Sequence, residues 1–325
     1  TVDNGISSAA EVAELRGKGI KVVVTDHHLP PGKDLPKADA LVNPHVEAVP
    51  GAEDLCGAGV AFFLACALTR VAAERGLFAG TKFGGPLLVL AGVATVADVV
   101  PLTGQNRVLV ANALRGFAAA PVGLKELLFC AQRTTKDLTA RDLGFLIAPR
   151  LNAAGRMASA REAYELVTAT DREQARKLAV VVNGRNAERR TVEERMDREA
   201  REQAGLVVGV PFTAPALVVR GPVPEPPAIS HSPSAISRPP WHSGVAGIVA
   251  ARLMEVVNVP VAVVVPGKDG AGHGSARAPE GYNVRDALAA SSAALVRFGG
   301  HAAAGGFTVK PGAFDAFRKL FTDAC

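Results

Sequence analysis

Aromatic residues and cysteines are scarce in this chain. Aromatic side chains make up 5% of its 325 residues, so alanine, valine and leucine have to fill the hydrophobic cores. The four cysteines show no CxxC spacing, which argues against a disulfide framework and a thiolate zinc site, and we expect reduced thiols in a cytoplasmic protein. No unbroken apolar run reaches the ~18 residues that span a bilayer, so we expect no membrane partner. The opening residues TVDNGISS are no charged-then-apolar leader, so we expect no secretory signal.

The remaining composition is that of a folded protein with a small basic excess. Apolar residues make up 48% of the chain and charged residues 21%, which is ordinary for globular domains. The length exceeds what one compact core of typical size needs, so two domains are expected. The formal net charge of +5 favours a polyanionic partner such as a nucleic acid.

The order of strand-like and helix-like segments predicts two α/β domains. Residues 1–160 alternate between the two patterns, which is typical of a parallel sheet covered by helices on both faces. Residues 161–206 are helical in pattern and highly charged, with opposite charges four residues apart, so we interpret them as a long connecting helix. Residues 207–325 are expected to form the second, smaller α/β domain.

Two segments of the second domain carry specific expectations. NVRDALAASSAALVRF, residues 283–298, is expected to be one helix. Residues 221–240 are rich in proline and serine and unsuited to regular structure, so we expect a flexible surface loop there, for which we find no physical role.

Candidate metal ligands follow strand-like segments. Asp26, His27 and His28 come directly after VVVT, a β-branched run typical of a short buried strand. Asp3 precedes an Asn-Gly turn, and Asp98 lies in the apolar stretch ATVADVVPL, where an unpaired buried carboxylate would be costly. Because open α/β sheets bind ligands at the carboxyl ends of their strands, we expect these groups to meet at strand ends.

The types of these side chains indicate hard metal ions. Carboxylates and imidazoles without thiolates suit Mn²⁺ or Mg²⁺, and two such ions about 3.5–4 Å apart form a clamp for phosphoryl displacement. Each residue also has an ordinary structural alternative. Asp3 could form a turn or cap a helix, Asp98 could be a hydrogen-bonded core carboxylate, and His301 could be a satisfied core histidine. Together they favour one metal-dependent site.

Seven motifs in order resemble the DHH phosphoesterase family, in particular its DHHA1-containing exonucleases that act on single-stranded DNA. The resemblance covers nearly the whole chain apart from the proline-rich segment. It implies a metal-dependent 5′→3′ exonuclease of DNA repair and recombination, with two Mn²⁺ or Mg²⁺ ions in the complete site. The motifs are VDNGIS, TDHH, ATVADVVPL, PRLNAAGRM, WHSGVAGIVAARL, GSAR and FGGHAAAGGF.

The resemblance also implies roles for individual residues. Asp3, His27 and Asp98 match metal ligands, and Asp3 matches the carboxylate that bridges both ions. The positions matched to catalysis are Asp26, His28 and His301. Among these, His28 is expected to face the substrate phosphate.

Contacts with the nucleic acid are implied in the second domain. Ser275 and Arg277 of GSAR resemble a pocket for the 5′-phosphate, which a hydroxyl and a guanidinium suit. Gly299, Gly300 and His301 resemble the GGH loop of the DHHA1 domain, where glycines allow a phosphate to approach closely.

Further contacts are implied in the first domain. Arg150, Asn152 and Arg156 fall where that domain meets the nucleic acid backbone. For the two arginines a structural ion pair is the alternative.

The implied partner is single-stranded DNA with a 5′-phosphate, together with a single-strand-binding protein and a helicase of the RecQ type. The family's first motif, a strand that ends in a DxD-type pair, is expected upstream of Thr1, and an OB-type domain after Cys325. Because residues 1–325 do not contain the first motif and its metal ligands, we expect this chain to bind single-stranded DNA and to cleave it poorly or not at all.

Two other functions remain open from the sequence. One is a phosphatase of short oligonucleotides or nucleotides with the same DHH–DHHA1 domains, which processivity on long strands would distinguish. The other is a non-catalytic protein that only binds single strands. The presence of Asp3, His27 and Asp98 argues against that second alternative.

Overall fold

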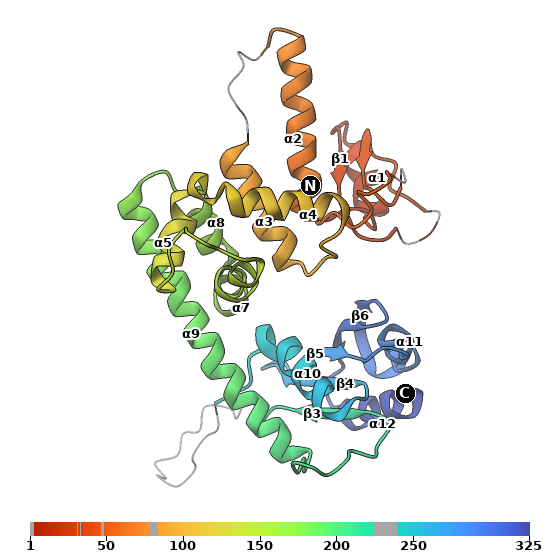
Figure 1. The fold of residues 1–325 in the computed structure, drawn as a ribbon. Coiled ribbons are helices and arrows are strands. Elements are labelled where there is room, and N and C mark those ends of the chain that lie inside the picture. Colours follow the sequence, from red (N-terminus) through yellow and green to blue (C-terminus); the bar gives the residue numbers. More distant parts are fainter. Residues whose placement is uncertain (1–2, 31, 33, 47–48, 78–83, 224–238) are drawn as a thin grey trace. The chain divides into compact units, whose positions relative to one another are not determined.

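The computed structural model describes residues 3–30, 32, 34–46, 49–77, 84–223 and 239–325. The chain divides into two compact units, unit 1 at Thr1–Asn186 and unit 2 at Ala187–Cys325. Both units combine helices with strands, as expected for an α/β protein (Figure 1).

Unit 1 contains a short parallel strand pair and many helices. β1 (Val23–Thr25) pairs in parallel with β2 (Ala40–Val42), and these are the only two strands of that sheet among the described residues. Val12 of α1, Val24 of β1 and Val22, which precedes β1, form a small core. The helices of unit 1 are α1 (Ala9–Gly17), α2 (Gly57–Glu74), α3 (Gly85–Ala97), α4 (Gly104–Arg115), η1 (Phe117–Ala119), α5 (Val122–Cys130), α6 (Ala140–Asp142), the π-helical η2 (Leu143–Ile147), α7 (Ala148–Met157) and α8 (Ala160–Thr168).

A larger core lies among the helices of unit 1. It joins α3, η1, α5, η2, α7, α8 and the first part of the long helix that follows α8, through buried side chains such as Val89, Phe117, Leu124 and Leu143. Burial of that many apolar side chains is the main favourable term in folding. The core therefore fixes the positions of α3 and α7. Asp98 lies at the end of α3, and Asn152 and Arg156 lie on α7.

Helix α2 has a more apolar surface than the search for unbroken apolar runs indicated. Its 18 residues are long and apolar enough to cross a membrane by length and composition, and 17% of them are buried. One such helix is weak evidence for a membrane span, because core helices of soluble proteins pass the same test of length and composition.

The charged stretch expected to be one connecting helix is two helices. α8 ends at Thr168, and α9 (Arg172–Gln203) begins after a short break. Asp171 caps the start of α9 with a side-chain hydrogen bond from the amide of Gln174. Such caps satisfy the free amides of a first helical turn and so start a new helix. Helix α9 contributes residues to both units.

Unit 2 is built on a five-stranded mixed sheet of order β3-β4-β5-β7-β6. β3 and β4 are parallel, and the other neighbouring strands are antiparallel. The strands are β3 (Leu217–Arg220), β4 (Val261–Pro266), β5 (Gly272–Arg277), β6 (Leu295–Gly300) and β7 (Ala304–Val309). The other elements are α10 (Ser243–Val257), α11 (Val284–Ala290), η3 (Ser292–Ala294) and α12 (Phe314–Ala324).

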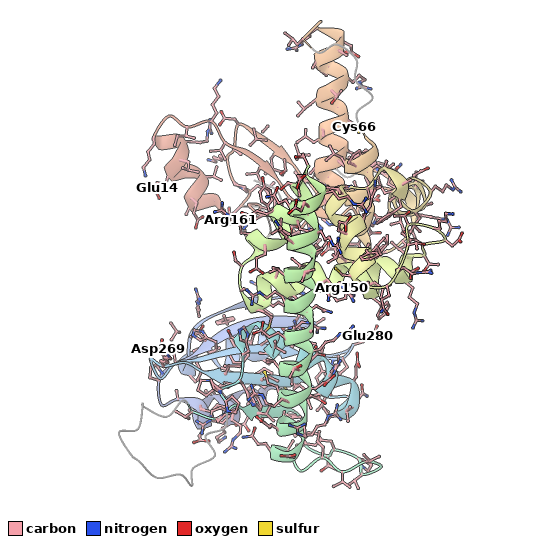
Figure 2. The ribbon with its side chains drawn as sticks, turned by 90° about the vertical axis from the view of Figure 1, so that its left-hand side faces the viewer. Glu14, Cys66, Arg150, Arg161, Asp269 and Glu280 are labelled. Atoms are coloured by element: carbon pink, nitrogen blue, oxygen red, sulfur yellow. The ribbon has the colours of Figure 1, made fainter. Side chains whose placement is uncertain are left out.

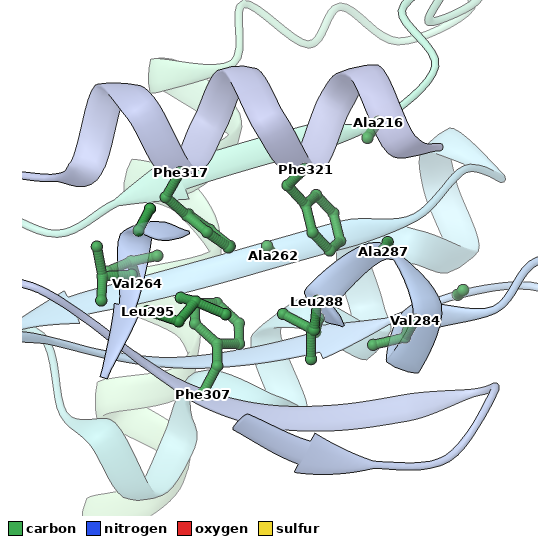
Figure 3. Packing of buried hydrophobic residues seen from close by; sticks show 14 residues of the cluster. Ala216, Ala262, Val264, Val284, Ala287, Leu288, Leu295, Phe307, Phe317 and Phe321 are labelled. Carbon is green, nitrogen blue, oxygen red and sulfur yellow. The ribbon is translucent and has the colours of Figure 1, made fainter. Parts of the chain in front are cut away.

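The core of unit 2 lies on one face of this sheet (Figure 3). Phe317 and Phe321 of α12 pack over the strands, and the ring of Phe317 lies 4.7 Å from that of Phe307 on β7. Leu288 of α11 completes the layer. α10 packs against β4 and β5.

The expectation of one helix over residues 283–298 is wrong in its second half. α11 ends at Ala290, and LVRF opens strand β6. Ser291 ends the helix by donating its hydroxyl hydrogen bond to the carbonyl of Ala287, a local bond through which serine competes with continued helix. Most of the proline-rich segment, residues 224–238, lies outside the described residues, so the expected loop remains a prediction there.

Candidate metal centre and phosphate cluster

Asp26 follows β1, and its carboxylate is buried, with 1% of the residue exposed. It accepts hydrogen bonds from the backbone amides of Ile6 at 2.9 Å, His27 at 2.8 Å and His28 at 3.2 Å. Its Oδ1 also lies 2.7 Å from Nδ1 of the His28 ring. Asp26 therefore has a structural role, because it links residues 26–28, which we call the DHH turn, to the segment that follows Asp3.

Hydrogen bonding decides the charge of this carboxylate. Burial would raise the pKa of Asp26, but the bonds from the Ile6 amide, the His28 ring and the amides of His28 and His27 outweigh it and lower that pKa. A charged Asp26 holds the Nδ1 side of His28 and leaves Nε2 for other partners.

His27 lies between the two candidate carboxylate ligands. Its Nε2 is 2.8 Å from Oδ1 of Asp3 and 3.7 Å from Oδ2 of Asp98. The His27 side chain is 13% exposed, whereas those of Asp3 and Asp98 are 63% and 43% exposed. We call Asp3, His27 and Asp98 the metal corner.

Two backbone positions at the metal corner are in the left-handed region. Asp3 has φ 65°, and Val99, directly after Asp98, has φ 59°. This region costs a β-branched residue about 1–2 kcal/mol, and such strain concentrates at functional sites. Asp98 itself caps the carboxyl end of α3. Its apolar neighbours had suggested a buried position at the end of a strand, but Asp98 is exposed and lies at the end of a helix.

The start of α2 closes one side of the metal corner. Gly57 is the first residue of α2, and a Cβ atom there would lie 2.7 Å from Oδ1 of Asp3. The preceding Cys56 accepts a hydrogen bond from the amide of Gly59 and lies 3.5 Å from the hydroxyl of Thr95 on α3. The α2 terminus thus contacts Asp3 and the helix that carries Asp98.

An open pocket of about 580 Å³ lies at the metal corner. Asn152 and Arg156 of α7 line it, together with both aspartates of the corner. Its lining residues are Asp3, Cys56, Gly57, Ala58, Ala94, Ala97, Asp98, Asn152 and Arg156.

Arg150 does not line this pocket. Arg150, which is labelled in Figure 2, is buried. Its guanidinium donates hydrogen bonds to Oδ1 of Asn183 at 2.9 Å and to the carbonyl of Leu146 at 2.7 Å. These contacts tie Arg150 of α7 to α9 and to η2.

In unit 2, Ser275 and Arg277 form a preassembled pair on β5, which we call the phosphate cluster. Nη1 of Arg277 donates to the hydroxyl of Ser275 at 2.9 Å and to the carbonyl of Ala276 at 2.8 Å. Helix α10 packs closely on them through Gly247, where a Cβ atom would lie 2.8 Å from Nη2 of Arg277. The glycine leaves room for the guanidinium.

Gly299, Gly300 and His301 lie at the end of β6 and in its turn to β7. The amide of His301 donates to the carbonyl of Ala304 at 2.9 Å, and His301 is exposed. Gly300 has φ 140°, and a Cβ there would lie 2.3 Å from the same carbonyl, so the turn requires glycine.

The structure brings the sequence-derived candidates into two groups. Asp3, His27 and Asp98 converge with Asn152 and Arg156 in unit 1. Ser275 and Arg277 pair in unit 2. The close contacts of Gly57 and Gly247 were not anticipated. A glycine inside or at the start of a helix costs stability, and that cost was the available indication at both positions.

The donor atoms of unit 1 fit a divalent ion. Ligand atoms of Asp3, His27 and His28 all lie within 4.8 Å of one another. Nδ1 of His28 is engaged by Asp26, and His27 lies between the carboxylates of Asp3 and Asp98. Oxygen and imidazole donors of this kind suit Mn²⁺ or Mg²⁺.

Comparisons with known families match both ends of the chain. Residues 1–81 match the DHH family, N-terminal domain, and residues 233–325 match the DHHA1 domain. The single-stranded-DNA-specific exonuclease RecJ of Dickeya dadantii is 39% identical over 99% of this chain and 55% of its own length. The chain thus spans about half the length of the curated relatives it matches.

Solved structures agree with these matches. RecJ from Thermus thermophilus in complex with Mn²⁺ superposes with a TM-score of 0.80 at 35% identity, over 99% of this chain and 44% of that one. Its complex with Mg²⁺ gives a TM-score of 0.73 at 33% identity, over 94% and 42%. An exonuclease RecJ bound to manganese gives 0.78 at 35% identity, and the match covers 99% of this chain and 74% of that one.

The sequence identities and superpositions extend over almost the whole chain, and the two family models match its two ends. The chain therefore belongs to the RecJ family and carries a DHH domain followed by a DHHA1 domain.

Proposed function

We propose that this chain is the catalytic part of a metal-dependent exonuclease that hydrolyses single-stranded DNA from a 5′-phosphorylated end. The observation that carries the proposal is the metal corner, where His27 lies between Asp3 and Asp98, and these two aspartates line a pocket together with Asn152 and Arg156. The RecJ relatives named as single-strand-specific exonucleases, and the RecJ structures with Mn²⁺ and Mg²⁺, support the same chemistry.

The residues of unit 1 would bind the ion and orient the scissile phosphate. Asp3, His27 and Asp98 would hold Mn²⁺ or Mg²⁺, which when bound polarises a phosphate and lowers the pKa of a water. Asp26 fixes the His28 ring through Nδ1, so that Nε2 of His28 can donate a hydrogen bond to a phosphate oxygen. Arg156 supplies positive charge on the pocket wall, and Asn152 an amide.

The residues of unit 2 would select the end of the strand. A terminal phosphate carries more charge than an internal one, and a guanidinium already paired with a hydroxyl suits it. Capture of the 5′-phosphate by Ser275 and Arg277 would give the 5′→3′ direction. Gly299, Gly300 and His301 would contact the strand beside them.

The biological setting follows from the substrate. Removal of single strands from a 5′ end belongs to DNA repair and recombination in the cytoplasm, where a single-strand-binding protein and a RecQ-type helicase would supply the strands. We propose the domain limits 1–160 for the DHH domain, 161–206 for the connecting segment that contains α9, and 207–325 for the DHHA1 domain.

The test is hydrolysis of a 5′-phosphorylated single strand with Mn²⁺ by the wild-type chain and by Asp98→Ala. Because this chain is expected to cleave poorly, the same pair is also assayed in a chain extended upstream through the first motif. We expect Mn²⁺-dependent release of mononucleotides by the extended chain, slow release by residues 1–325, and a loss of at least about 100-fold on Asp98→Ala. Equal rates with and without Asp98→Ala in the extended chain would contradict the proposal. Release of phosphate from dinucleotides without degradation of long strands would favour the phosphatase alternative, and strand binding without hydrolysis by the extended chain would favour the non-catalytic binder.

A further inference from the structure

The antiparallel part of the sheet in unit 2 is rich in glycine. Six glycines lie in β5, β6 and β7. Glycine inside a strand weakens it, and it often marks a place where another group approaches the backbone closely. The reason for each of the six can be read from its surroundings.

Four of these glycines are required by the protein itself. A Cβ atom at Gly272, Gly274 or Gly305 would lie 2.6 Å or less from a core side chain. Gly300 has φ 140° and contacts the carbonyl of Ala304.

Gly299 and Gly306 have no such internal reason. A Cβ atom at either position would have no described atom within 4 Å, and neither has a positive φ. Both residues are exposed. A β-branched residue would fit each position and would stabilise the strand.

These two glycines lie beside the phosphate cluster. Ser275 is directly opposite Gly306, and Gly306 is directly opposite Gly299. Directly opposed residues point to the same face of a sheet, so the three form a row across β5, β7 and β6. Strands are about 4.8 Å apart, so the row extends ~10 Å from Ser275, which is the length of one nucleoside.

We propose that Gly299 and Gly306 form a ledge on which the sugar and base of the 5′-terminal nucleotide lie, while Ser275 and Arg277 hold its phosphate. This inference rests on the proposed function and assigns the nucleoside subsite next to the phosphate. Gly299 and Gly306 lie opposite each other in the paired strands β6 and β7 and carry no side chain, so the contact is made by the flat backbone surface. Such a surface suits the flat face of a base or sugar and is tolerant of sequence.

The test is Gly306→Val, whose side chain would project into the open space above the ledge. The probes are thymidine 5′-monophosphate and inorganic phosphate, with binding followed by chemical-shift titration of the whole chain. We expect the variant to bind the nucleotide at least about tenfold more weakly, as when a stacked base loses its surface, and to bind phosphate as the wild type does.

Two further variants complete the design. Gly184→Val of α9 is the matched control, because a Cβ there also meets no described atom within 4 Å, and it should leave both affinities unchanged. Arg277→Ala should weaken both probes, since it removes the phosphate contact.

The possible outcomes separate the two claims. Unchanged nucleotide binding by Gly306→Val would overturn the ledge and leave the proposed nuclease intact. A lower melting temperature of Gly306→Val would show that internal packing needs this glycine, which also overturns the ledge. A wild-type chain that binds neither probe would contradict the ledge and the proposed 5′-phosphate selection together.

Discussion

The metal corner of unit 1 and the phosphate cluster of unit 2 are built on different kinds of backbone. Asp3 and the residue after Asp98 are in the left-handed region, at the ends of elements. Ser275 and Arg277 lie in a regular strand, two residues apart, and their positions follow from antiparallel register.

This difference shows where each site obtains its geometry. A strand places alternate side chains on one face without further help. A site at element ends needs neighbours that hold it, and here Asp26 and Gly57 serve that purpose at the DHH turn and at Asp3. Substitutions of neighbouring residues should therefore disturb the metal corner from a greater distance than they disturb the phosphate cluster.

The largest expected effect is on the free energy of unfolding of Asp26→Ala. The change leaves three buried or half-buried amides without their acceptor, each at ~1–3 kcal/mol, so we expect a loss of about 3 kcal/mol or more. Urea unfolding measures it, with Ser275→Ala as the matched change in unit 2, expected to cost less than about 1 kcal/mol. Equal losses would remove the contrast between the two sites.

The charge of Asp26 also predicts a pH dependence. Its pKa is lowered in the folded state, so its stabilisation is fully present above the ordinary value of 3.8 and is lost as pH falls through the lowered pKa. The difference in unfolding free energy between wild type and Asp26→Asn should therefore shrink from pH 6 to pH 3. A difference that grows over this range would contradict the assigned charge.

Arg277→Ala should weaken the preference for a 5′-phosphorylated over a 5′-hydroxyl single strand by ~1–3 kcal/mol, the usual cost of a lost charge-assisted hydrogen bond. Fluorescence anisotropy with strands of one sequence measures the two affinities. The same loss on both strands would make Arg277 a general backbone contact.

Gly57→Ala should weaken Mn²⁺ binding about tenfold, since the added Cβ displaces Oδ1 of Asp3, and altered support of a ligand typically costs 10–100-fold. Alanine is the better helix former, so the melting temperature should not report this damage. Calorimetric titration measures the affinity, with Gly184→Ala as control. Wild-type affinity in Gly57→Ala would show that Asp3 moves freely.

The smallest expected effect is a gain in stability for Val99→Gly. Relief of a left-handed valine outweighs the larger unfolded-state entropy of glycine, so we expect about 0.5–1 kcal/mol by urea unfolding. Val99 is 87% exposed, so little packing is lost. A decrease in stability would show that this position is not strained.

The family resemblance of the motifs named the candidate residues of both sites, and the structure shows how their surroundings hold them. The motifs pointed to Asp3, His27 and Asp98 and to Ser275 and Arg277, and the structure brings each of these two groups together. The sequence did not place Asp98 at a helix end, because an apolar run fits a buried strand as well as a helix. The contacts of Arg150 with Asn183 and of Gly57 with Asp3 join residues that are distant in the sequence, so local sequence patterns do not predict them.

The measurement that tests the central claim most directly is the binding of Mn²⁺ to the chain, followed by loss of the free-ion signal in electron paramagnetic resonance. The account predicts that the wild type and Ser275→Ala bind Mn²⁺ alike, and that Asp98→Ala and His27→Ala bind it far more weakly, because these residues provide ligands of the metal corner. Binding of Mn²⁺ by Asp98→Ala and His27→Ala with wild-type affinity would contradict the account.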